Sequence, residues 1–337
     1  MGIWSLAWEE AVRRRDFIAK FGAATLVLPS TARAQKRKRP LIGWLSSATQ
    51  AYSDSKAAVF LRALQDLGYV EGQNFDIVYR SSGGNQDRLP ALAEELVRLK
   101  PDVILAIAIA AVIPARKATS TIPIVSPALA DAVHLGVIAS EARPGGNVTG
   151  IEPYVAGLPA KQLEIAREIV PGARTIGLLT NLVDPKAPPQ LKEIEAAGQA
   201  LEIKLVAKDA NRPDEVEGAL QFLADQKVDV VIVLQTSMLI SQTRPIAESA
   251  IAKRLPTVYG YREHVVDGGL ISYGVDLRWC YQRAAALVVK ILNGTAPGDI
   301  PVEFPSSVLL SINLRVAKLI GITVPPALLA RADEVIE

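Results

Sequence analysis

Cysteine, histidine and aromatic residues are scarce in this chain of 337 residues, which contains one cysteine, two histidines and 5% Phe, Trp and Tyr. The single cysteine, Cys280, excludes an intrachain disulfide and a cysteine-rich zinc site. His134 and His264 leave little for a histidine-based metal site, so we expect neither a metal nor another cofactor. Cys280 follows Trp279 within a helical pattern, which favours a buried core residue over a reactive thiol.

Motifs of the common catalytic classes are also absent. The sequence has no G-x-S-x-G nucleophile motif, no G-x-G-x-x-G motif after a strand and no phosphate-binding loop. One cysteine cannot supply the paired thiols that two-lobed α/β racemases use. We therefore expect no catalytic residues and keep an exported α/β enzyme only as an alternative.

Neither charge nor hydropathy points to nucleic acid or to a membrane span. The net charge of +2 divides into +2 for residues 1–34, +4 for residues 36–39 and −4 for residues 40–337. A mildly acidic body offers no electrostatic footprint for a phosphate backbone. No segment approaches the about 18 consecutive apolar residues of a transmembrane helix, while a hydrophobic content of 50% is enough for a large core.

The first 34 residues have the order of a bacterial export signal. Residues 14–18 (RRDFI) match the twin-arginine pattern, residues 21–28 form a short apolar stretch, and residues 32–34 (ARA) form a small-residue cleavage pattern. We expect a twin-arginine signal over residues 1–34, cleavage after Ala34 and a soluble mature protein in the periplasm. A cytoplasmic amphipathic helix is the alternative interpretation.

From residue 40 onward, short β-branched runs alternate with longer helical patterns. Such alternation is typical of parallel sheets built from βαβ units. The expected strands are residues 41–45, 75–79, 103–107, 122–125, 175–179, 203–206, 228–234, 257–259 and 270–273. The expected helices are residues 55–67, 89–99, 159–169, 190–201, 213–226, 244–253 and 277–292.

Three segments of the first half recur in the same order in the second half. The pairs are residues 41–46 with 175–180, 100–105 with 227–232, and 122–125 with 255–258. A helical pattern separates the members of each half, so two similar lobes explain the repeats economically. We predict an α/β fold of two similar Rossmann-like lobes with parallel sheets, joined by a multi-strand hinge.

Turn-rich segments mark where the chain is expected to cross between the lobes. Residues 143–150 have the turn chemistry of a connection, residues 267–269 (DGG) are the expected return, and residues 301–305 are a possible third crossing. Hinged lobes of this kind close around ligands. The predicted division is lobe one at residues 39–148 plus 275–302 and lobe two at residues 150–272 plus 304–337.

In open parallel sheets, ligands bind beyond the carboxyl ends of the strands. At these ends the sequence places Ser46, Ser47, Ala108, Ile109 and Ser126 in lobe one, and Thr180, Asn181, Gln235, Thr236, Ser237, Tyr259 and Tyr261 in lobe two. The two serines suit helix capping equally well, although a capped helix start also suits a ligand carboxylate. Tyr52, Tyr261 and Tyr273 either wall a ligand or pack between the lobes.

Several segments together resemble one protein family. They are residues 39–47 (RPLIGWLSS), 67–74 (LGYVEGQN), 118–125 (ATSTIPIV), 142–150 (ARPGGNVTG), 268–274 (GGLISYG) and 322–336 (ITVPPALLARADEVI). Over residues 39–337 the chain resembles the ABC-transporter substrate-binding proteins of the tryptophan-binding-protein-like family. The resemblance implies a type I periplasmic-binding-protein fold that holds a ligand between its lobes and delivers it to a membrane permease and its ATPase. Some relatives bind aromatic amino acids, and many have no assigned ligand.

The resemblance also bears on single residues. Asn181 matches the asparagine that follows the first strand of the second lobe in relatives, although Leu182 replaces the usual proline. Asp131 lies where relatives usually have Asp-Pro-Val, and it either pairs with a ligand ammonium or caps its own loop. Arg262 and Glu263 are either ligand contacts or an ion pair in the hinge.

The clearest departure from the family is at residues 106–110 (AIAIA). Relatives usually carry Gly-Thr or Gly-Ser here, whose hydroxyl would donate to the ligand. The replacement makes the first-lobe wall more apolar, and residues 238–240 add apolar surface on the other side. We expect an amino-acid-like or aromatic ligand with a substantial apolar part.

The predicted function is that of a soluble periplasmic solute-binding component of an ABC importer, acting as a monomer on a small-molecule ligand. A ligand-sensing subunit for a membrane receptor is an alternative that the sequence does not separate from transport. A repressor-type regulator has the same two-lobed fold, but the export signal takes the place of its DNA-binding headpiece.

Overall fold

The computed structural model describes residues 39–337 except Thr49 and Tyr154. The predicted export signal lies outside the described residues. Residues 39–337 form one compact unit, separate from residues 1–38, and the description that follows concerns that unit. No helix within the described part of the chain is long and apolar enough to cross a membrane.

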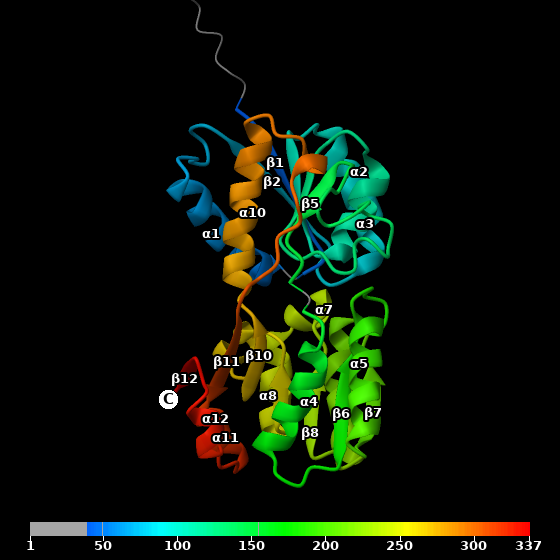
Figure 1. Cartoon of the computed structure of the whole chain (residues 1–337), viewed down its shortest axis with the longest axis vertical. Coiled ribbons are helices and arrows are strands. Elements are labelled where there is room, and N and C mark those ends of the chain that lie inside the picture. The colour runs from blue at the N-terminus through cyan, green and yellow to red at the C-terminus, as the bar shows by residue number, and fades with distance from the viewer. Residues whose placement is uncertain (1–38, 49, 154) are drawn as a thin grey trace, which may run out of the picture. The chain divides into compact units, whose positions relative to one another are not determined.

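The first lobe contains a five-stranded parallel sheet in the order β2-β1-β3-β4-β5. Helices α1 and α10 lie side by side on one face of this sheet, and α2 and α3 pack together on the other (Figure 1). The strands are β1 (Leu41–Ser46), β2 (Asp76–Ser81), β3 (Val103–Ile107), β4 (Ile124–Ser126) and β5 (Val148–Gly150). The helices are α1 (Gln50–Asp66), α2 (Leu89–Arg98), α3 (Ile109–Ala118) and α10 (Leu277–Leu292), with a short 3₁₀ turn, η1, at Gln86–Arg88 and another, η3, at Pro297–Asp299.

The second lobe contains a seven-stranded sheet in the order β12-β11-β10-β9-β8-β6-β7. Helices α4 and α5 cover one face, and α6 and α8 cover the other. The strands are β6 (Thr175–Thr180), β7 (Lys204–Asp209), β8 (Val230–Val233), β9 (Thr257–Tyr259), β10 (Ile271–Val275), β11 (Val308–Asn313) and β12 (Glu334–Ile336). The helices are α4 (Leu158–Ile169), α5 (Ala187–Ala200), α6 (Val216–Asp225), α7 (Ser237–Ile240), α8 (Thr243–Ala252), α9 (Arg262–Val266), α11 (Leu314–Ile320) and α12 (Pro326–Leu329), with η2 at Pro213–Glu215.

The two-lobed α/β fold predicted from the sequence is confirmed, and α10 spans the predicted residues 277–292. The sequence did not reveal β5, β11 or β12. One pair also departs from the expected parallel sheets, because β11 runs antiparallel to β10. After α10 the chain re-enters the second lobe from the first, so β11 joins the sheet edge in the opposite direction to β10.

The chain passes between the two sheets three times: after β5, between β10 and α10, and before β11. The first and third passages run alongside each other, since the N–H of Glu152 donates to the carbonyl of Glu303 at 2.9 Å and the N–H of Glu303 donates to that of Gly150 at 3.0 Å. The sequence predicted that the turn at residues 267–269 is the return crossing, and this prediction is wrong. The turn leads from α9 into β10, which belongs to the second sheet. The residues at which the lobes divide stay a prediction.

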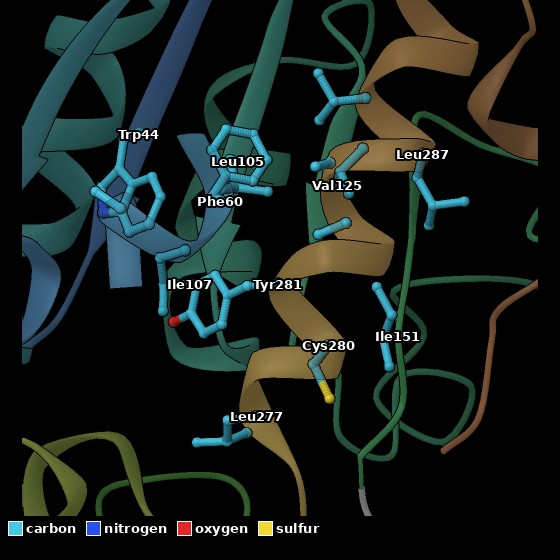
Figure 2. Packing of buried hydrophobic residues seen from close by; sticks show 14 of the residues in the cluster. Trp44, Phe60, Leu105, Ile107, Val125, Ile151, Leu277, Cys280, Tyr281 and Leu287 are labelled. Carbon is cyan, nitrogen blue, oxygen red and sulfur yellow. The ribbon is translucent and has the colours of Figure 1, made fainter. Parts of the chain in front are cut away.

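An aromatic cluster holds α1 and α10 to the first sheet (Figure 2). The Trp44 ring stacks on Tyr281 with centroids 6.1 Å apart and meets Phe60 edge-on at 5.9 Å. Cys280 is 0% exposed within this cluster, and burial raises the pKa of its thiol, which confirms the prediction of a core cysteine. The burial of this cluster fixes the start of α10, from which Leu277 and Tyr281 project.

A close approach at Gly274 in β10 fixes the path of the return crossing. A Cβ at Gly274 would lie 1.8 Å from the carbonyl oxygen of Gly260, the residue that follows β9. We predict that Gly274→Ala lowers the free energy of unfolding by about 3 kcal/mol or more, because the two backbones must separate. In the control, Gly218→Ala in α6, the new Cβ meets nothing within 4 Å and helix propensity favours a gain of up to about 1 kcal/mol. Urea unfolding of both variants measures this, and similar small changes would contradict the packing.

His264 makes the stability of the second lobe depend on pH. Its ring is 1% exposed and stacks on Tyr259 with centroids 4.5 Å apart, and burial lowers its pKa from 6.5 to about 3. As the pH falls, the imidazole is therefore protonated in the unfolded state before it is protonated in the folded state. The contribution of His264 to the free energy of unfolding is fully present above pH 6.5 and falls by about 1.4 kcal/mol per pH unit as the pH drops toward 3.

We predict that His264→Phe removes this slope between pH 6.5 and 5 in urea unfolding. His134→Asn, which changes the chain's exposed histidine, is expected to keep the slope. Equal slopes in the wild type and His264→Phe would show that His264 is not the titrating group.

Candidate functional site

A small cavity lies between the two lobes and receives side chains from both. Its volume is about 30 Å³, room for about two water molecules, whereas ligand pockets usually measure about 300–1,000 Å³. A ligand of ten or more heavy atoms therefore enters only if the cavity widens, and separating the lobes widens it. The lining consists of Ser47, Ala48, Tyr52, Ile107, Ala108, Ala128, Leu277 and Tyr281 from lobe one, and Lys186, Ser237, Ile240 and Tyr261 from lobe two.

Five of the predicted site residues line this cavity and six do not. Those on the lining are Ser47, Tyr52, Ala108, Ser237 and Tyr261. Those off the lining are Ser46, Ile109, Asp131, Asn181, Thr236 and Tyr273.

The sequence left open whether Ser46 and Ser47, which end and follow β1, cap a helix or contact a ligand, and the structure places the two serines differently. The Ser46 Oγ accepts the Ala48 N–H at 3.1 Å and bonds to the Ser53 hydroxyl at 3.1 Å, so Ser46 shapes the turn into α1. Ser47 is 2% exposed, and its Oγ has no hydrogen-bond partner among the described residues. A buried hydroxyl without a partner is costly, so Ser47 is the serine that a ligand would satisfy.

Ala108 keeps the backbone conformation of a glycine. Its φ of 65° and ψ of 164° lie in a region that residues with a Cβ rarely adopt. At residues 106–110 this chain therefore carries a Cβ at a position whose backbone conformation favours glycine. Ile109, the next residue, is 0% exposed and packs in the core between the sheet, α2 and α3, so only Ala108 of this pair forms part of the cavity wall.

The loop after β8 repeats this arrangement in the second lobe. The Thr236 Oγ1 accepts the N–H of Leu239, so Thr236 caps the short helix α7. The N–H of Ser237 donates to Asp184 Oδ2 at 2.8 Å, while the Ser237 Oγ is buried without a partner among the described residues. Asn181 lies off the lining; its Nδ2 donates to the carbonyl of Ala210 at 3.0 Å, and its Oδ1 is buried without a partner among the described residues.

Three tyrosine rings wall the cavity, and burial raises the pKa of each of them, Tyr52, Tyr261 and Tyr281. Neutral phenols offer both a flat apolar face and a hydroxyl that donates and accepts. Tyr273 lies in β10 and packs against the clusters of both lobes, with its carbonyl accepting from Gln162 Nε2 at 2.9 Å. Tyr273 therefore belongs to the packing between lobes.

Asp131 is exposed, has a positive φ of 51° and accepts the N–H of Leu135 through its carbonyl. Its position gives it no place on the cavity lining. Arg262 and Glu263 do not pair with each other. Arg262 makes a two-pronged contact with Glu334 at 2.6 and 2.5 Å, and Glu263 pairs across the lobes with Lys56 at 2.5 Å.

Sequence reasoning missed five lining residues: the small Ala48 and Ala128, and the larger Lys186, Leu277 and Tyr281. Leu277 and Tyr281 lie at the start of α10, which begins a new element after a crossing and does not follow a strand of its own lobe. Lys186 lies six residues after β6, at the start of α5. A lysine in a loop that leaves the carboxyl end of a strand was the available signal, but only the residues next to the strand ends were considered.

A larger depression, of about 340 Å³, lies between α2 and α3 of the first lobe. All its lining residues belong to one lobe, so movement of the lobes does not open or close it. Among the described residues, no group of three or more His, Cys, Asp or Glu is placed to hold a metal ion.

Comparison with known proteins agrees with this geometry. Residues 52–336 match the family described as ABC transporter substrate binding protein. The chain is 27% identical over 270 residues to a tyrosine-binding protein of Clostridioides difficile (strain R20291), covering 80% of this chain and 77% of that one.

Solved structures of several proteins are similar to this chain in fold. A conserved domain protein from Vibrio cholerae O1 biovar El Tor has a TM-score of 0.80 at 28% identity, with 88% of this chain and 100% of that chain covered. A ligand-free, open substrate-binding protein from Clostridium difficile has a TM-score of 0.61 at 25% identity, with 88% and 99% covered. An ABC domain in complex with L-Trp from Streptococcus pneumoniae shares the fold, with a TM-score of 0.80 at 24% identity and 89% and 100% covered. The family match covers nearly the whole described chain, and the structure has two α/β lobes with a cavity lined by both of them. The chain therefore belongs to the ABC transporter substrate-binding protein family and has the type I periplasmic-binding-protein fold.

Proposed function

We propose that this protein is the exported, periplasmic ligand-binding component of an ABC importer and that its ligand binds in the cavity between the lobes. The observation that carries the proposal is the cavity itself, in which Ser47 and Ser237 present buried hydroxyls without partners from opposite lobes. In the closed form, where these hydroxyls are buried, a ligand with polar groups can satisfy both of them and so stabilise closure. The twin-arginine pattern at residues 14–18 supports the export.

The proposed mechanism is hinge closure. The three passages of the chain between the sheets allow the lobes to rotate, and the ligand binds best where both walls contact it, so binding shifts the population toward the closed form. A membrane permease with its ATPase then recognises the closed form. The similar protein from Clostridioides difficile is named for binding tyrosine, which together with the three tyrosines on the lining supports a ligand with an aromatic or apolar part.

A thermal-shift screen of the mature chain from Gln35 tests the function. A ligand at about 100 times its dissociation constant should stabilise the protein by roughly 2.7 kcal/mol, which raises Tm by a few degrees. The variant Ser47→Leu, which fills the cavity, should lose that rise, whereas Ser120→Leu on the exposed surface should keep it. A library of amino acids, organic acids and short peptides that leaves Tm unchanged would contradict the proposal.

The ion pair between Lys56 and Glu263 tests the closure. Both side chains are largely buried, with 6% and 15% exposed, and they come from α1 of one lobe and α9 of the other. Breaking such a pair leaves a buried charge and costs about 3–5 kcal/mol. We predict that Glu263→Gln shifts the ligand-free protein toward separated lobes, seen as a larger radius of gyration in small-angle scattering.

Glu217→Gln is the matched control, since its pair with Lys253 lies within one lobe and the Glu217 side chain is 67% exposed. This control should leave the radius unchanged. An unchanged radius in Glu263→Gln as well would mean that the pair does not hold the lobes together.

A further inference from the structure

Lys186 is the charged residue on the cavity lining. It is 7% exposed, and none of the ion pairs found between described residues includes its ammonium group. Its backbone is fully used, because its N–H donates to Asp184 Oδ1 at 3.0 Å and its carbonyl accepts from Gln190 Nε2 at 2.8 Å. The Lys186 Nζ is not one of the fully buried polar atoms that lack a partner among the described residues, so it keeps access to the cavity or to solvent, where an anionic group can reach it.

The nearby acidic residues Asp184, Glu263 and Glu152 lie off the cavity lining. The Asp184 carboxylate is 0% exposed and accepts the N–H groups of Lys186 and Ser237. Glu263 is off the lining and its charge is paired with Lys56, and Asp131 is exposed. The lining therefore offers one cation and no anion, which suits a ligand that carries a negative charge and has no ammonium group to satisfy.

The remaining walls define the rest of such a ligand. Ser47 and Ser237 supply hydroxyl donors without partners, and both line the same cavity as Lys186. Apolar groups from Ile107, Ala108, Ile240 and Leu277 and the three tyrosine rings make up the rest of the wall. The lining therefore combines one cationic group with two hydroxyl groups, surrounded by aromatic and aliphatic side chains.

We propose that the ligand is a monocarboxylate with an aromatic or branched apolar body, bound through its carboxylate to the Lys186 ammonium, and that an α-ammonium group weakens its binding. This inference rests on the proposed function and specifies the ligand class of the same cavity. Ser47 and Ser237 donate to the carboxylate or to a polar substituent on the body. The ligand also supplies the counter-charge that Lys186 lacks, so closing the lobes on it relieves a cost that the ligand-free protein carries.

Matched compounds test the ligand class by isothermal titration calorimetry on the mature chain. Two sets are used: 3-phenylpropanoate, phenylalanine and phenethylamine, and the corresponding indole propanoate, tryptophan and tryptamine. We expect an acid from these sets to bind at least tenfold more tightly than its amino acid, and no binding of the amines. Equal or tighter binding of the amino acids, or binding only of compounds without a carboxylate, overturns the inference but leaves the proposed function standing. Absence of binding by every compound in the sets also overturns it, and the wider thermal-shift screen then decides the function separately.

The substitution Lys186→Met tests the residue and has two readouts. Acid binding should fall about 10- to 100-fold, the usual effect of losing one charge-assisted hydrogen bond. The ligand-free variant should melt at a higher temperature than the wild type, because an unpaired buried charge has been replaced by an apolar side chain of similar length. Lys192→Met, on the exposed face of the same helix α5, should change neither affinity nor melting temperature. A lower melting temperature with unchanged affinity would show instead that Lys186 is a structural counter-charge to Asp184.

Discussion

The rest of the structure depends on the three passages of the chain between the two sheets. They place the carboxyl ends of both sets of parallel strands against one cavity, which is where an open α/β sheet presents its loops and helix starts. Two of the passages are bonded to each other through Gly150, Glu152 and Glu303, and the Arg283 guanidinium binds the Glu303 carboxylate at 2.6 and 2.8 Å. These contacts anchor the paired passages to α10 of the first lobe.

The cavity between the lobes brings together several features that cost free energy when no ligand is bound. Ala108 holds a glycine-like backbone, the Ser47 and Ser237 hydroxyls are buried without a partner among the described residues, and Lys186 is a largely buried residue. Each of these features costs free energy in the ligand-free protein. A ligand between the lobes can offset these costs, which is why the proposed site is placed here.

Much of the fold could be predicted from the sequence because buried parallel strands read as apolar runs and the second half repeats the first. The limits of α10 followed from a helical pattern that ends at Asn293-Gly294. The third crossing and the strand β11 were harder, because the chain re-enters the second sheet after a helix of the first and no local pattern records that return. The return crossing was assigned to the Gly268-Gly269 turn, yet such a turn serves equally well to connect two elements of one lobe.

The candidate site was predictable only in part. The rule that ligands lie at the carboxyl ends of strands found Ser47, Ala108, Ser237 and Tyr261, which line the cavity. It also selected their neighbours Ser46, Ile109 and Thr236, because periodicity does not tell which of two adjacent residues turns toward the core or caps a helix. Lys186 and Tyr281 reach the cavity from helix starts, and their approach to it depends on tertiary packing that the sequence does not display.

The most direct test of the account is a crystal structure of the mature chain with the tightest-binding carboxylate. The account predicts the ligand between the lobes, with a carboxylate oxygen about 2.7–2.9 Å from Lys186 Nζ and the ring against Tyr52, Tyr261 or Tyr281. A ligand found in the depression between α2 and α3, or one whose carboxylate points to solvent while Lys186 pairs with Asp184, would contradict it.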